Sequence, residues 1–109
     1  MSVPRNAQSF LVEEMTYPGK AGAIRMVKKH DKDLIAGFEH ACPCGCGKWS
    51  FIRLNPEGWA PGTVPMWKRV SGDDLHMTLT PSIGVLPRDP KTGAYHWHGF
   101  LENGIFVER

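Results

Sequence analysis

The stretch Cys42-Pro43-Cys44-Gly45-Cys46-Gly47 decides how this chain is organised, because it contains all three of its cysteines. Thiols that alternate with proline and glycine do not pair readily, since a disulfide across one intervening residue is strained. Three thiolates that converge on one metal ion are the more natural arrangement. The glycines after Cys44 and Cys46 let the backbone turn tightly around bound sulfur. We therefore predict a metal site in this loop.

A second cluster, His96-Trp97-His98, supplies two imidazoles. Residues i and i+2 of a strand share a face, so both histidines are predicted to point the same way. Sulfur with imidazole is the ligand chemistry of Zn²⁺, and a closed tetrahedral set is usually structural. The predicted site is Cys₂His₂ or Cys₃His, and the fourth ligand stays open, with His40 as a further substitute. The candidate metal ligands are Cys42, Cys44, Cys46, His96 and His98.

The rest of the sequence predicts a mainly β fold of six or seven short strands around a zinc knuckle. With 12 glycines and 9 prolines, the chain is rich in turns. Short segments of β-branched, aromatic and alternating residues between these turns read as antiparallel strands. The cysteine loop should join two of them as a hairpin. The expected strands are 23–27, 34–41, 49–54, 66–70, 75–80, 95–101 and 105–107.

The C-terminal segment carries the clearest hairpin signal. Asn103-Gly104 separates two apolar runs, and this dipeptide readily adopts the positive φ values that a tight hairpin turn needs. Residues 87–93 are predicted to be a loop. At the N-terminus, residues 6–16 read as a strand or an irregular arm, so we treat residues 1–109 as one zinc-binding domain with 1–20 as a candidate irregular arm.

Length and composition narrow the class of protein. A chain of 109 residues is one domain, and a formal net charge of +2 does not by itself indicate nucleic-acid binding. No apolar run is long enough to cross a membrane, and the N-terminus lacks the apolar stretch of a signal peptide. We expect a cytoplasmic protein, where thiols stay reduced and available to a metal.

Three segments give the chain a recognisable resemblance. They are residues 40–47 with the cysteines, 77–83 (Met-Thr-Leu-Thr-Pro-Ser-Ile) and 98–104 (His-Gly-Phe-Leu-Glu-Asn-Gly). In order and spacing they resemble a family of small phage and bacterial proteins that is catalogued as a domain of unknown function and regarded as metal-binding. Some of its members lie in bacterial operons for ubiquitin-like conjugation.

The resemblance implies that Cys44, Cys46 and His98 are ligands. The family usually has a cysteine three residues before that histidine, where this chain has Tyr95. His96 or Cys42 is the natural replacement. The resemblance brings no established activity with it.

Three functions are compatible with these observations. The favoured one is a phage-related structural zinc protein that binds another protein, a host factor or a conjugation or defence component, with Trp59 and Trp67 as candidate contacts. A nucleic-acid-binding zinc module is an alternative.

The other alternative is a zinc-dependent hydrolase, which would need an open metal position and a general base. Its candidate bases are Glu39, Glu102 and the pair Asp73-Asp74. None of them stands at a recognised spacing from the ligands. Ser82 is a conceivable functional hydroxyl, although Thr80-Pro81-Ser82 reads first as a turn.

Overall fold

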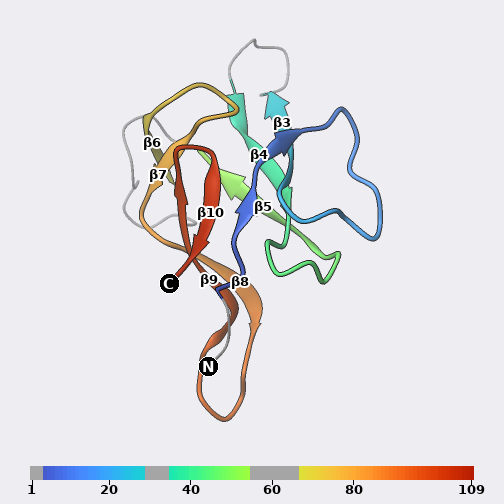
Figure 1. Cartoon of the computed structure of the whole chain (residues 1–109), viewed down its shortest axis with the longest axis vertical. Helices are drawn as coiled ribbons and strands as arrows, with labels where there is room; N and C mark the ends of the chain where they lie inside the picture. Colours follow the sequence, from blue (N-terminus) through green and yellow to red (C-terminus); the bar gives the residue numbers. More distant parts are fainter. Residues whose placement is uncertain (1–3, 29–34, 55–66) are drawn as a thin grey trace.

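The structure is a computed structural model that describes residues 4–28, 35–54 and 67–109. Within these residues the regular elements are ten β-strands, and none is a helix (Figure 1). The predicted β fold is therefore confirmed, but the predicted number of strands was too low. Strand β8 (Ile83–Arg88) has no counterpart among the expected strands. The segment 6–16, read as a strand or an irregular arm, contains two short strands, β1 (Ala7–Gln8) and β2 (Phe10–Leu11).

The first sheet contains four antiparallel strands in the order β1-β10-β9-β8. Its central strands are β9 (Tyr95–Glu102) and β10 (Ile105–Glu108). They are joined by Asn103 and Gly104, whose φ values of 47° and 79° are those of the predicted tight hairpin. Strand β9 pairs with β10 on one edge and with β8 on the other.

The second sheet has the order β2-β3-β4-β5, and a separate pair is formed by β6 and β7. The cysteine loop connects β4 to β5, as predicted. Strand β7 is shorter than expected, because Leu75 and His76 lie in a turn where both backbone N–H groups donate to Asp73 Oδ1. The strands are β3 (Ala23–Lys28), β4 (Ile35–Ala41), β5 (Trp49–Arg53), β6 (Lys68–Ser71) and β7 (Thr78–Thr80).

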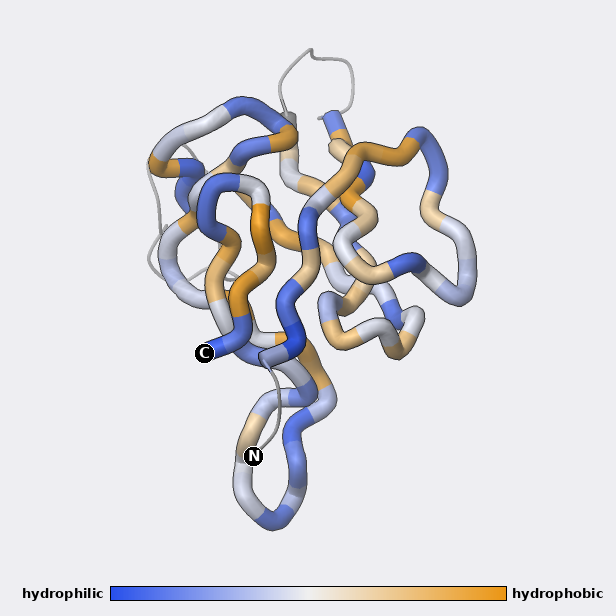
Figure 2. The backbone as a smooth tube through the Cα atoms, viewed as in Figure 1, coloured by the Kyte–Doolittle hydropathy of each residue, from blue (hydrophilic) through white to orange (hydrophobic). Residues whose placement is uncertain are grey.

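The two four-stranded sheets share one apolar core. Alternate residues of β9 are buried, and Trp97 is fully enclosed while its Nε1–H donates to the Arg5 carbonyl at 2.8 Å. Phe106 of β10 stacks on His40 of β4, with 5.2 Å between ring centroids. Apolar residues gather along the central strands in Figure 2, whereas the turn between β8 and β9 is largely polar.

Strand β8 corrects the predicted loop at 87–93, because Pro87 and Arg88 belong to this strand. Proline cannot donate to a ladder, but β8 is an edge of its sheet, where a missing N–H is tolerated. The pairing of β8 with β9 shifts register between Val85 and Arg88. The turn end of the hairpin that these strands form extends beyond the rest of the first sheet (Figure 1).

The N-terminal segment links the two sheets through β1 and β2. Ser9, between them, is buried, and both its N–H and its hydroxyl donate to the Gly104 carbonyl, at 2.8 and 2.6 Å. Residues 7–9 of the candidate arm are therefore tied to the C-terminal hairpin, and residues 10–11 to β3 of the second sheet.

No helix long and apolar enough to cross a membrane occurs in the described parts of the chain.

Replacing Phe106 with Ala should strongly destabilise the fold. Its ring is fully buried and contacts both Trp97 and His40, so truncation opens a cavity between the sheets. We expect a loss of about 3–5 kcal/mol in the free energy of unfolding, measured by denaturant titration. The neighbouring Ile105 is partly exposed, and Ile105→Ala should cost less than about 1 kcal/mol. Equal losses in the two variants would contradict this account of the core.

Candidate metal centre and serine–histidine pair

The cysteine loop is a compact turn at the end of the second sheet. The two ends of the loop are joined by a hydrogen bond from the Cys42 N–H to the Lys48 carbonyl, at 2.8 Å. Its first turn is closed by a hydrogen bond from the Gly45 N–H to the Cys42 carbonyl, at 3.0 Å. Gly45 and Gly47 both have φ near 88°, a conformation that favours glycine. The backbone therefore curls around its three sulfur atoms in the way that the sequence predicted.

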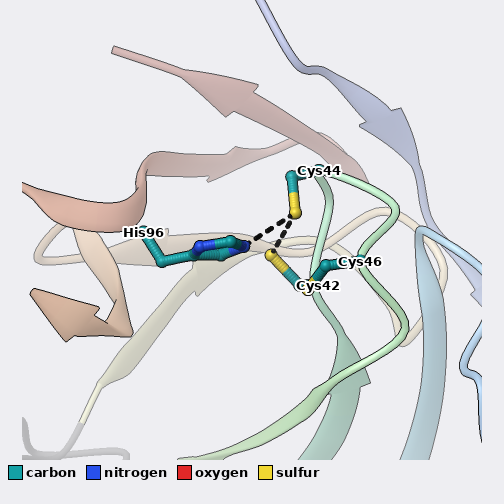
Figure 3. Close-up of side chains that lie close together, drawn as sticks. All are labelled: Cys42, Cys44, Cys46 and His96. Carbon is teal, nitrogen blue, oxygen red and sulfur yellow. Dashed lines mark hydrogen bonds between the residues drawn. The ribbon is translucent and has the colours of Figure 1, made fainter.

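His96 lies in β9 of the first sheet, and its side chain reaches the three cysteines of the loop (Figure 3). The four candidate ligand atoms all lie within 4.8 Å of one another. His96 Nε2 is 3.0 Å from Cys44 Sγ, and Cys42 Sγ is 3.2 Å from the same sulfur. The set offers three sulfurs and one nitrogen from two sheets, which is a donor set able to bind a metal ion.

Burial differs sharply among the three free thiols. Cys42 is part of the apolar core, and burial raises the pKa of its thiol to about 12. Cys46 is exposed, and the pKa of its thiol is lowered. The small loss of solvent at this thiol acts to raise the pKa, but hydrogen bonds from the Lys48 backbone N–H and from the thiols of Cys44 and Cys42 favour the thiolate more strongly. A thiolate at Cys42 needs a nearby positive charge, and a bound metal cation would supply one.

The remaining histidines of the sequence-based ligand set lie elsewhere. His40 is fully buried against Phe106, outside the cluster, and burial lowers its pKa to about 4. Its Nδ1–H faces the Ala41 carbonyl at 3.3 Å, and its Nε2 has no partner among the described residues. His98 also lies outside the cluster that contains His96. The two β9 histidines, expected to chelate one ion together, thus reach different partners.

His98 forms a pair with Ser82, which lies in the short connection between β7 and β8. His98 Nε2 is 3.0 Å from Ser82 Oγ, and His98 Nδ1 is 2.9 Å from the main-chain oxygen of Arg109. That oxygen can only accept, so Nδ1 carries the proton and Nε2 is left as an acceptor for the Ser82 hydroxyl. This is the tautomer that a histidine needs to act as general base toward a serine.

The sequence reading noted Ser82 but did not connect it to His98. A signal was present, because two of the three segments that carried the family resemblance, 77–83 and 98–104, contain these two residues. Trp67 adds a third contact: its Nε1–H donates to the Ser82 carbonyl at 3.1 Å. Trp59, the other predicted contact tryptophan, lies outside the described residues.

An open depression of about 540 Å³ lies beside His98. Its lining includes Tyr95 and His98 of β9, Glu108 of β10, Arg109 and Arg5 of the N-terminal segment. His98 is therefore within reach of a molecule that approaches this face. Arg5 crosses the same region, where its guanidinium pairs with Glu108.

The acidic residues considered as general bases for a zinc hydrolase lie in ion pairs. Glu39 pairs with Arg25, and Glu102 pairs with Arg109. Asp74 pairs with Arg69, while Asp73 lies beside His76. In the described parts of the chain, the group of residues able to hold a metal contains no carboxylate.

Residues 11–108 match the family model of BubE, described as a bacterial ubiquitination-like system serine protease. The chain belongs to this family. The BubE match agrees with the sequence-based resemblance to proteins of ubiquitin-like conjugation operons. The phage connection stays a prediction. No curated protein and no solved structure matched the chain.

The two β9 histidines should respond differently when a metal is added. We expect His96→Ala to weaken binding of Co²⁺, because it removes one of four donors, whereas His98→Ala should bind it like the wild type. Titration of reduced protein with Co²⁺, followed by the thiolate-to-metal absorption band, measures this. A weakened titration in His98→Ala with an unchanged one in His96→Ala would reverse the assignment.

Proposed function

We propose that this chain is a serine protease of a bacterial ubiquitination-like system, in which Ser82 is the nucleophile and His98 its general base. One observation carries the proposal: the hydrogen-bonded series from Ser82 Oγ to His98 Nε2, and from His98 Nδ1 to the Arg109 main-chain oxygen. A nucleophile bonded to a base, which is in turn oriented by a third group, is the arrangement that serine catalysis requires. The family description supports the same reading.

In the acylation step, Ser82 Oγ attacks the carbonyl carbon of the substrate and passes its proton to His98 Nε2. The Arg109 oxygen accepts a hydrogen bond from Nδ1–H throughout, so it holds the ring in place and favours the cation that forms. His98 then donates the Nε2 proton to the leaving nitrogen as the carbon–nitrogen bond breaks. This leaves an acyl group on Ser82 and a neutral imidazole.

In the deacylation step, water takes the place of the departed amine. His98 Nε2 accepts a proton from the water as its oxygen attacks the acyl carbon, and returns a proton to Ser82 Oγ when the ester bond breaks. Fixing the donor and acceptor distances in advance is worth a large part of such a rate enhancement. The Trp67 indole N–H contributes to this positioning by donating a hydrogen bond to the main-chain carbonyl of Ser82.

The partner that this proposal implies is a protein component of the same ubiquitination-like system, taken as substrate. Protein binding, which the sequence analysis favoured, is then part of the protease function. The depression beside His98 supports an approach from that face of the first sheet. Nucleic-acid binding and a cytoplasmic location stay predictions.

A fluorophosphonate probe should label the wild-type protein at Ser82 alone. Such probes react with serines that are activated by a base, so they need no identified substrate. Ser82→Ala should not be labelled, and His98→Ala should be labelled roughly 10²–10⁴-fold more slowly, because the general base is lost. Intact-mass and peptide mass spectrometry measure the extent and place of labelling.

Ser71→Ala serves as the matched control, since Ser71 is an exposed serine of β6 and should leave labelling unchanged. Thermal melts of all variants report whether the fold is kept. Labelling that persists in a folded Ser82→Ala protein, or a wild-type protein that never reacts, would refute the proposed nucleophile.

We further propose that the cluster of Cys42, Cys44, Cys46 and His96 holds Zn²⁺ in a structural site. Three thiolates and one imidazole match the ligand preference of this ion, and four protein donors leave no open position for water. When bound, the ion would supply a cross-link between the cysteine loop and β9. The loop curls around the site and Cys42 belongs to the core, which supports a role in folding.

Removing zinc should unfold the protein or lower its melting temperature sharply, because binding at such a site contributes on the order of 10 kcal/mol to folding. We expect a chelator titration to release zinc and lose β-sheet circular dichroism together. Cys44→Ser should melt at a lower temperature and gain little from added Zn²⁺. Zinc that can be stripped while the melting temperature stays unchanged would contradict a structural role.

A further inference from the structure

The Tyr95 ring stacks on the His98 imidazole. Their centroids are 5.8 Å apart and the ring planes are inclined by 17°, within the range of offset aromatic stacking. Residues three apart on a regular strand point to opposite faces, so this contact is not expected from the spacing. It lies beside the register shift in the β8–β9 pair, where three steps along β8, from Val85 to Arg88, match two steps along β9, from Trp97 to Tyr95.

Arg88 of β8 holds the Tyr95 ring in this position. Its guanidinium carbon is 4.4 Å from the ring centroid, and one of its nitrogens donates to the Tyr95 hydroxyl at 2.7 Å. The two residues also face each other across the β8–β9 pair. Tyr95 is therefore fixed both through its ring face and through its hydroxyl.

Gly84 makes room for the ring. It is the β8 residue directly opposite His98, and a Cβ added to it would lie 2.8 Å from atoms of the Tyr95 ring. Any side chain at this position would push the ring away from where it lies. The missing side chain at Gly84 and the bond from Arg88 thus favour the same placement of Tyr95.

We propose that Tyr95 is a positioning residue for His98, an inference that rests on the proposed serine-protease function. His98 is held in its own plane by hydrogen bonds at Nδ1 and Nε2. The Nε2 bond must change partner during the reaction, from Ser82 to the leaving group, and the ring is then held by Nδ1 alone. A stacked aromatic ring keeps the imidazole from turning while that exchange takes place.

The matched variants Tyr95→Phe and Tyr95→Leu separate the ring from its hydroxyl. Phe keeps a flat ring beside His98, whereas Leu removes it and retains an apolar side chain. With a fluorophosphonate probe, we expect Leu to lower the maximal rate of Ser82 labelling roughly tenfold with little change in half-saturating probe concentration. Phe should stay within about threefold of the wild type, because the stack itself survives.

Gly84→Ala should lower the maximal labelling rate as Tyr95→Leu does, since its methyl group displaces the ring. Melting temperatures show whether each variant is folded. Equal rates for wild type and Tyr95→Leu would overturn the inference, as would equal losses for Phe and Leu. A change in half-saturating concentration alone would also overturn it, because it would make Tyr95 a contact for the probe.

A second measurement does not depend on activity. The ring current of Tyr95 should shift the His98 imidazole proton resonances, and this shift should persist in Ser82→Ala and Tyr95→Phe but disappear in Tyr95→Leu. An unchanged His98 spectrum in Tyr95→Leu would contradict the stack. If the wild-type protein fails to react with the probe while the ring-current shift is present, the proposed protease function fails and the stack stands without that role.

Discussion

Strand β9 is hydrogen-bonded on both edges, to β8 and to β10, and the rest of the structure depends on this pairing. Its alternate residues Trp97, Gly99 and Leu101 are buried in the core. Its remaining positions include His96, which reaches the cysteine loop, and His98, which reaches Ser82. Because the strand is hydrogen-bonded on both edges, the backbone position of each of these residues is fixed, as a precise site requires.

Local chemistry in the sequence was enough to predict several parts of this arrangement. The hairpin at Asn103-Gly104 follows from the φ values that these residues adopt, and the loop between β4 and β5 follows from three thiols interleaved with proline and glycine. The confirmed β architecture follows from short alternating segments between many turns. In each case the signal lies within a few residues of the feature that it predicts.

The parts that were missed depend on contacts between distant segments. Strand β8 contains Pro87, which reads as a loop until the pairing shows that the strand is an edge. The period of a strand correctly places His96 and His98 at equivalent positions, but it does not say which partner each one reaches. Ser82 lies in the connection between β7 and β8, and the sulfurs lie in the loop between β4 and β5, so only the tertiary fold gives one histidine an oxygen partner and the other a sulfur partner.

The hydrogen bonds of His98 also explain why it does not take part in the metal cluster of His96 and the cysteines. Both of its nitrogens are used, one by the Arg109 oxygen and one by Ser82, so it could bind a metal only by giving up one of these bonds. Among the residues that the structure describes, the hydrogen-bond partner of His96 Nε2 is Cys44 Sγ, itself a candidate metal ligand. A metal held by His96 and the cysteines would tie β9 to the second sheet two residues from His98 without involving either hydrogen bond of His98. One strand can then carry both the proposed metal site and the proposed serine–histidine site, because the side chains leave the same backbone toward different partners.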